Sequence, residues 1–198
     1  MSQNKTRKGL LLIGYQNDYF AEDGVLRGVV AESVQANNLL ENTLSLIDRS
    51  LEENVSVFVT PIKFFDDYRE LDRPVGILKT CKEVGAFKRS SSGSDTIPEL
   101  KKYGDAIKEL PGKTGLNAFS NTELLDALRA LEIEELLIAG VVTSVCIDST
   151  ARYAADQGFR VSILSDCTAG RNSFEQEYYC EHIFPIFAQV TNSKVALD

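Results

Sequence analysis

Short, largely apolar runs alternate along this chain with longer stretches of helical character. Four such runs cover residues 9–13, 55–60, 135–139 and 160–164. Parallel strands that are covered by helices on both faces have this composition, and strands that alternate with helices indicate an α/β fold. The pattern therefore predicts an open, mostly parallel α/β sheet.

The stretches between these runs carry apolar residues at the spacing of an amphipathic helix. We expect helices over residues 31–52, residues 122–131, a segment after Cys146, and a segment that begins near Ser173. Asn121 is the expected N-cap of the second helix, because an asparagine side chain accepts a backbone N–H at that position. Two further short strands are expected at residues 106–110 and 188–190.

Residues 61–103 lack both patterns and contain a serine-rich stretch at 90–94. A region this long without regular structure usually carries function in a compact domain, and we interpret it as a lid over a pocket. The chain has 198 residues, a length typical of one domain with a substantial core. We therefore expect a single domain over residues 1–198, with 61–103 as an irregular insertion.

Composition argues against several other classes of protein. The net charge of −8 and the lack of a basic cluster disfavour a nucleic-acid surface. Residues 1–8 are polar, and the apolar run after them is too short to span a membrane, so we expect neither a signal peptide nor a membrane span. The four cysteines show no CxxC or CxxH spacing, which indicates neither a zinc site nor a disulfide framework. We expect a cytoplasmic, reducing environment.

Cys146 is the first candidate for a catalytic residue. It follows the apolar run 135–139 and a glycine turn at Gly140, where a strand is expected to end and a helix to begin. A helix N-terminus favours thiolate over thiol, because its dipole and its free N–H groups stabilise negative charge. The alternative is a buried core cysteine, since free cysteines are among the most buried residues.

Two other polar segments are expected near Cys146. Residues 16–18 follow the first strand, and Lys113 follows the strand at 106–110. Ligands of parallel α/β sheets bind at the carboxyl ends of the strands, and three separate elements here bring polar side chains to that edge. This convergence favours a functional site over core packing.

Several motifs, in order along the chain, resemble the isochorismatase-like cysteine hydrolases, a family that includes nicotinamidases and other amidases. The motifs are residues 11–20 (LLIGYQNDYF), Lys113 with 118–119, residues 140–146 (GVVTSVC) with 149–151, and residues 165–167 (SDC). The resemblance covers nearly the whole chain. It implies a three-layer α/β sandwich with a mostly parallel sheet of about six strands, a catalytic triad of Asp, Lys and Cys, and a homo-oligomer, either a dimer or a tetramer.

Two members of that triad carry over to this chain by resemblance. Cys146 matches the nucleophile, and Lys113 matches the lysine that stabilises its thiolate. The resemblance also implies a cis peptide between Val141 and Val142. The N–H groups of Val142 and Cys146 would then form an oxyanion hole for the tetrahedral intermediate.

The third member of the triad is missing. The family motif begins with an aspartate and often ends in Asn-Asp-Phe, whereas this chain has Gly14 at the aspartate position and continues as Gln16-Asn17-Asp18-Tyr19. In the family this aspartate takes the thiol proton and later passes it to the leaving group. Loss of such a general acid–base typically costs on the order of 10²–10⁴ in rate.

Four other aspartates are considered as substitutes. Asp18 lies about 13 Å further along if the strand stays extended. Asp66 and Asp67 belong to the expected lid, and Asp166 follows the fifth strand, where local turn or helix-capping support is its simplest role. A water molecule in the space of the missing side chain is at least as good an interpretation. Without a carboxylate beside it, Lys113 is predicted to hold Cys146 as a thiolate. The alternative is that a desolvated Lys113 loses its proton and acts as a base itself.

Neither a metal site nor a cofactor is expected. His182 is the single histidine, and residues 61–67, where nicotinamidases of the family bind a metal, contain none. This disfavours nicotinamide as the substrate, and the missing aspartate disfavours cleavage of isochorismate. The chain has no P-loop and no GxGxxG motif. Phe64 and Phe119 are candidates for apolar walls of a substrate pocket.

The sequence therefore predicts a hydrolase that cleaves a small amide or related C–N bond through a Cys146 thioester, impaired by the loss of the catalytic aspartate. Its expected partner is a small-molecule substrate, with no nucleic acid and no membrane. The alternative is a catalytically silent family member that binds a small molecule or a protein partner. A third interpretation is that Gly14 marks a variant of an active enzyme.

Overall fold

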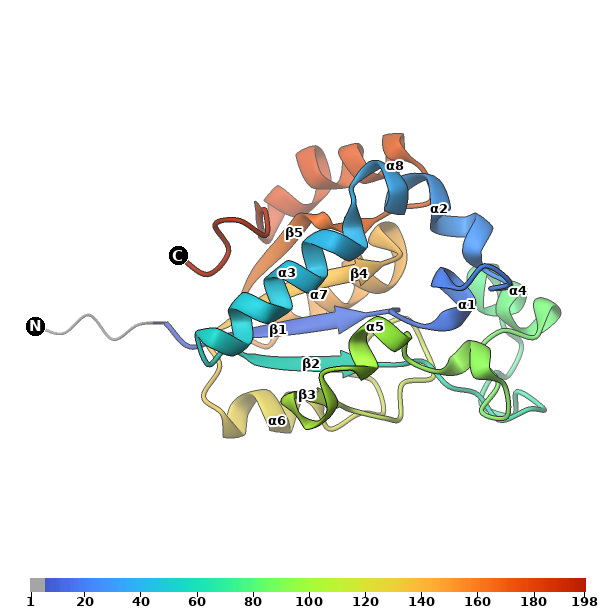
Figure 1. The fold of residues 1–198 in the computed structure, drawn as a ribbon. Helices are drawn as coiled ribbons and strands as arrows, with labels where there is room; N and C mark the ends of the chain where they lie inside the picture. Colours follow the sequence, from blue (N-terminus) through green and yellow to red (C-terminus); the bar gives the residue numbers. More distant parts are fainter. Residues whose placement is uncertain (1–5) are drawn as a thin grey trace, which may run out of the picture.

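Residues 6–198 are described by a computed structural model (Figure 1). Six strands form one sheet in which every neighbouring pair is parallel. The spatial order is β3-β2-β1-β4-β5-β6, with bounds β1 Lys8–Ile13, β2 Ser56–Thr60, β3 Ile107–Glu109, β4 Glu135–Val141, β5 Arg160–Ala169 and β6 Gln189–Thr191. The central strands β1 and β4 are almost wholly apolar, as expected when both faces of a sheet are covered. The predicted parallel sheet of about six strands is confirmed.

Helices cover both faces of this sheet (Figure 1). Their bounds are α1 Asn17–Phe20, α2 Arg27–Ala36, α3 Leu39–Glu52, α4 Gly76–Val84, α5 Pro98–Lys101, α6 Leu124–Ala130, α7 Asp148–Asp156 and α8 Ser173–Tyr178. On β1, Leu10 and Leu12 belong to the core that includes α3, whereas Leu11 and Ile13 belong to the core that includes α6 and α7. Because successive residues of a strand point to opposite faces, this alternation builds the expected three-layer sandwich.

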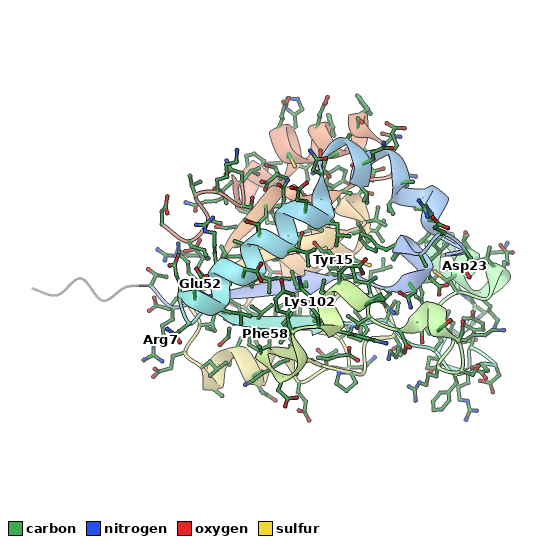
Figure 2. All side chains as sticks on the ribbon, in the orientation of Figure 1. Arg7, Tyr15, Asp23, Glu52, Phe58 and Lys102 are labelled. Carbon is green, nitrogen blue, oxygen red and sulfur yellow. The ribbon has the colours of Figure 1, made fainter. Side chains whose placement is uncertain are left out.

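The side chains follow the same division between interior and surface. Tyr15 and Phe58 are fully buried and lie in the interior, whereas Arg7 and Asp23 are exposed at the margins (Figure 2). No helix within residues 6–198 is long and apolar enough to cross a membrane.

The single helix predicted over residues 31–52 is wrong, because the segment forms two helices, α2 and α3. Asn38 between them has a φ of 48°, a left-handed conformation that a right-handed helix cannot contain. The side chain of Asn37 donates to the carbonyl of Thr168 (2.8 Å), which holds this break against the end of β5. β5 itself extends beyond the predicted residues 160–164.

The predicted N-cap of α6 is also wrong. α6 begins at Leu124, and Asn121 lies before it with a left-handed φ of 61°. The Asn121 side chain instead donates to the hydroxyl of Thr114 (3.1 Å). The hydroxyl of Thr122 accepts the N–H of Leu124 (3.4 Å) and supports the first turn of the helix.

Residues 61–103, which we call the cap segment, are more regular than predicted. They contain α4, α5 and a 3₁₀ turn, and they lie beside α1 at the carboxyl end of the sheet (Figure 1). The hydroxyl of buried Tyr68 donates to the carbonyl of Ala86 (2.7 Å). Asp18 of α1 accepts the backbone N–H of Phe87 (2.6 Å). These hydrogen bonds order the cap segment and attach it to the edge of the sheet.

Candidate active site

The connection between β4 and α7 places Cys146 at the carboxyl edge of the sheet. After β4, Thr143–Ile147 form a single π-helical turn that leads directly into α7. Helical structure therefore begins before Cys146, not at it. π-helical turns are rare and are frequent at functional sites. The peptide bond between Val141 and Val142, which precedes this turn, is cis.

Lys113 meets Cys146 inside the protein. Its Nζ lies 3.7 Å from the Sγ of Cys146, and the two residues are only 2% and 7% exposed. Both line a small cavity of about 20 Å³, which we call the chamber. The residues that line the chamber are Gly14, Tyr19, Ile62, Ile77, Leu78, Cys81, Phe87, Lys113, Leu116, Val141, Val145 and Cys146. The structure thus brings Gly14, Lys113 and Cys146 together.

Among residues 6–198, no carboxylate lines the chamber. The four aspartates considered as substitutes have other partners: Asp18 the N–H of Phe87, Asp66 the N–H of Ser90, Asp67 the side chain of Arg69, and Asp166 the N–H and hydroxyl of Ser193. Burial raises the pKa of the Asp18 carboxyl above its ordinary value. The role of the family's aspartate is therefore not filled by another aspartate.

Gly14 follows β1 in a conformation that disfavours side chains. Its φ is 77°, in the left-handed region where a Cβ causes strain. A Cβ at this position would lie 2.7 Å from the carbonyl oxygen of Val141 and 2.8 Å from its Cγ2. An aspartate here would require movement of the end of β1 or of β4.

The aromatic walls of the chamber differ from those predicted. Phe64 packs against Tyr68 within the cap segment, with ring centroids 5.4 Å apart, and Phe119 packs against α7. Neither residue lines the chamber, and their role as walls of a substrate pocket stays a prediction. Tyr19 and Phe87 line it instead, with ring centroids 5.3 Å apart. Tyr19 lies in the motif that follows the first strand, which is the signal that could have identified it.

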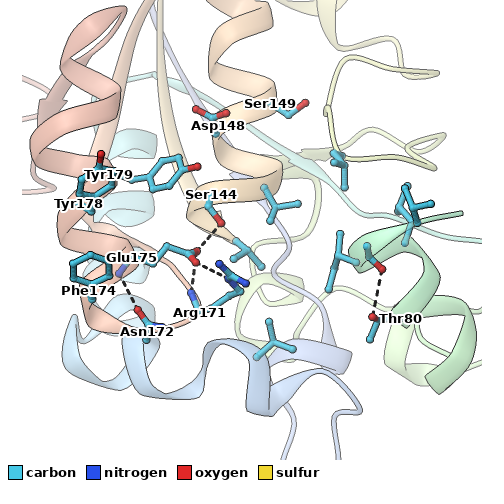
Figure 3. A pocket seen from close by; sticks show the side chains of 18 residues that line it. Thr80, Ser144, Asp148, Ser149, Arg171, Asn172, Phe174, Glu175, Tyr178 and Tyr179 are labelled. Atoms are coloured by element: carbon cyan, nitrogen blue, oxygen red, sulfur yellow. Dashed lines mark hydrogen bonds and ion pairs between the residues drawn. The ribbon is translucent and has the colours of Figure 1, made fainter.

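A larger cavity of about 1010 Å³, the groove, lies outside the chamber (Figure 3). It is lined by residues of α2, of α4 in the cap segment, of α8 and of the start of α7. Four side chains line both cavities: Ile77, Leu78, Leu116 and Val145. These four side chains border both cavities, and we call them the partition.

Comparison with known proteins agrees with this geometry. The isochorismatase domain matches residues 8–195 of the chain. The chain belongs to the isochorismatase family. Nicotinamidase 3 of Arabidopsis thaliana is a relative with 27% identity over 169 residues, which cover 85% of this chain and 76% of that protein. Ureidoacrylate amidohydrolase RutB of Cronobacter sakazakii is 24% identical over 82% of this chain and 74% of its own length.

Solved structures of this family have the same fold. Nicotinamidase PncA from Bacillus subtilis superposes with a TM-score of 0.72 at 26% identity, covering 94% of this chain and 100% of that one. A cysteine hydrolase from Pseudomonas syringae pv. phaseolicola 1448A gives a TM-score of 0.83 at 19% identity, with 98% and 92% coverage. The second likeness shows the fold alone, and both support the three-layer architecture.

In this isochorismatase-family chain, one wall of the groove is polar. Glu175 accepts hydrogen bonds from the Ser144 hydroxyl (2.6 Å) and from the Nε of Arg171 (2.5 Å; Figure 3). Burial alone would raise the pKa of Glu175, but the hydrogen bonds from Ser144 and Arg171 lower it. Because Ser144 lies in the same π-helical turn as Cys146, Glu175 helps to hold the turn that carries Cys146. Neither Glu175 nor Arg171 was predicted from the sequence.

The other three cysteines lie in environments that keep them protonated. Burial raises the pKa of Cys81 and Cys167 to about 12 and that of Cys180 to about 11. Within residues 6–198, no group of three His, Cys, Asp or Glu side chains is arranged to hold a metal ion. His182 lies on the surface, with its ring centroid 5.2 Å from that of Tyr178.

Proposed function

We propose that this isochorismatase-family hydrolase cleaves an amide or related C–N bond of a small molecule through a thioester on Cys146. The observation that carries the proposal is the 3.7 Å contact between the Nζ of Lys113 and the Sγ of Cys146. An ammonium group beside a thiol favours the thiolate, which is the nucleophilic form. Relatives named as a nicotinamidase and a ureidoacrylate amidohydrolase support this class of bond.

In the proposed reaction, the Cys146 thiolate attacks the carbonyl carbon of the substrate. The N–H groups of Val142 and Cys146 are proposed to bind the oxyanion that forms. The C–N bond then breaks, the amine leaves, and water releases the acid from the thioester. Lys113 stabilises the thiolate before the attack and after its release. The leaving amine needs a proton, and no carboxylate of the described chamber lining is available to supply it.

We propose that the cap segment acts as a lid on the single domain 1–198. The partition supports this role, because Ile77 and Leu78 belong to α4 and separate the chamber from the groove. Movement of α4 would join the two cavities and admit a substrate. The small chamber and Gly14 are also the observations that favour the alternative, a family member that binds but does not turn over.

The protein is further proposed to form a homo-oligomer in the cytoplasm, without a nucleic-acid partner. Exposed apolar side chains at Val75, Phe174 and Ile186 support contact with another copy of the chain. Four free cysteines support a reducing compartment. The net charge of −8 opposes binding of nucleic acid.

Ammonia release from a panel of small primary amides and ureido compounds tests the proposed function. We expect activity that Cys146→Ala abolishes and that Lys113→Met lowers strongly, because the methionine keeps the volume of the lysine stem but removes the charge. An activated acyl ester is used in parallel, and its acyl group should be found on Cys146 by mass spectrometry. Absence of both turnover and acylation would favour the silent binder.

A further inference from the structure

Tyr19 is a side chain of the chamber that the thioester chemistry leaves unused. It lies in α1 and lines the chamber together with Lys113 and Cys146. Only 6% of the residue is exposed. The family motif often has a phenylalanine at this position, so the aromatic ring is expected there. The hydroxyl group is what distinguishes this chain.

The hydroxyl of Tyr19 has no hydrogen-bond partner among residues 6–198. Tyr15 provides the contrast, because its hydroxyl bonds to that of Thr43 (2.7 Å) and donates to the carbonyl of Cys167 (3.3 Å). The Tyr19 hydroxyl also keeps accessible surface, because the fully buried side-chain oxygens without a partner in the described residues are those of Ser50 and Thr60. The hydroxyl of Tyr19 is therefore a donor that remains available to a bound molecule.

The surroundings of Tyr19 keep this donor protonated. Burial raises its pKa well above the ordinary value, and the nearby Asp18 carboxyl acts in the same direction. At neutral pH the side chain is thus a neutral phenol. It can give up its proton only to a group that becomes strongly basic during a reaction, and the nitrogen of a breaking C–N bond is such a group.

We propose that Tyr19 is a catalytic residue that protonates the leaving amine, in place of the aspartate that Gly14 lacks. The proposal rests on the thioester hydrolysis proposed above. No carboxylate of the described residues lines this chamber, while a hydroxyl stands at a position where the family motif often has a phenylalanine. Tyr19, Lys113 and Cys146 line one cavity, so a small substrate admitted by movement of α4 would lie beside all three.

In this proposal Tyr19 gives up a proton in the first half-reaction and regains one in the second. When the tetrahedral intermediate collapses, the C–N bond breaks and the proton of the Tyr19 hydroxyl passes to the nitrogen. The amine leaves, and the phenolate remains in the chamber with the Lys113 ammonium. Water then attacks the thioester carbon and loses a proton to the phenolate. The C–S bond breaks, which returns the Cys146 thiolate and the neutral phenol.

The variant Tyr19→Phe tests this role, because it removes the hydroxyl and keeps the ring. We expect kcat for an alkyl amide to fall by about 10²-fold or more. Hydrolysis of the matching p-nitrophenyl ester should fall far less, because its leaving group departs without a proton. The alkylation rate of Cys146 and the Tm should not decrease. Tyr15→Phe, which removes another buried tyrosine hydroxyl, should leave the ratio of amide to ester activity unchanged.

Equal losses on amide and ester, or no loss on the amide, would overturn the role of Tyr19. If ester hydrolysis requires Cys146 but the amide-to-ester ratio is the same in Tyr19→Phe, this inference fails and the proposed function stands. If the unaltered protein cleaves neither substrate, both fail together. Each result therefore decides one proposal or both.

Discussion

The carbonyl oxygen of Val141 lies 2.7 Å from the position that a Cβ on Gly14 would take. The ends of β1 and β4 approach each other closely at the position that the sequence resemblance matches to the family's aspartate. Because Gly14 also has a φ of 77°, both the backbone and its neighbour oppose a side chain. The backbone at this position therefore fits a glycine better than any residue with a side chain.

Substitution of Gly14 should therefore cost stability. Gly14→Ala and Gly14→Asp are each expected to lower the free energy of unfolding by about 1–3 kcal/mol, because a Cβ there is strained. Urea denaturation of the two variants measures this cost. Gly14→Ala is the matched control for the carboxylate itself. An aspartate variant as stable as the parent and faster on amides would show that the backbone adapts more easily than its geometry indicates.

Alkylation of the protein should select one thiol. Burial raises the pKa of Cys81 and Cys167 to about 12 and that of Cys180 to about 11, so these thiols are almost wholly protonated at pH 7.5. We expect iodoacetamide to modify Cys146 first, and Lys113→Met to slow that reaction. Peptide mapping by mass spectrometry checks the site. Faster modification of Cys180 would contradict the prediction.

The partition should control the size of reagent that reaches Cys146. Leu78→Ala shortens a side chain that lies between groove and chamber. In Leu78→Ala we expect the rate of reaction with Cys146 to rise more for bulky maleimides than for iodoacetamide. Val84→Ala is the control, because Val84 lies at the end of the same helix and is exposed. A similar gain in both variants would indicate a loosened helix instead of an opened partition.

Asp18 should make stability depend on pH in a defined direction. Burial raises its pKa above the ordinary value of 3.8, so the folded protein holds this proton more tightly than the unfolded chain. By linkage, its contribution to the free energy of unfolding decreases as pH rises from about that value through the folded-state pKa. Asp18→Asn removes the titration. The difference in stability between parent and variant, measured from pH 4 to 7, should therefore shift in favour of the variant as pH rises.

Much of the fold was predictable, because buried parallel strands have a local signature. The runs that became β1, β2 and β4 are short and apolar, and their boundaries changed little. The break at Asn38 was not predictable in the same way, since the apolar spacing continues across it. A contact distant in sequence, from Asn37 to Thr168, holds that break.

The site was predicted in part for similar reasons. Lys113 and Cys146 follow strands, and strand ends of a parallel sheet meet at one edge, so their contact was accessible from sequence order. The chamber walls were not, because they depend on how the cap segment folds back. The bond from Phe87 to Asp18 joins residues 69 positions apart. No local pattern reports such a contact.

The partition has a consequence for how long each enzyme molecule survives. A chamber of about 20 Å³ has room for roughly one water molecule. If the cap segment acts as the proposed lid, oxidants and electrophiles larger than water reach Cys146 by the same route as the substrate. Substrate binding and chemical damage to Cys146 would then depend on the same movement of α4. Under the proposed lid role, any change that speeds the entry of substrate would also shorten the working life of the protein.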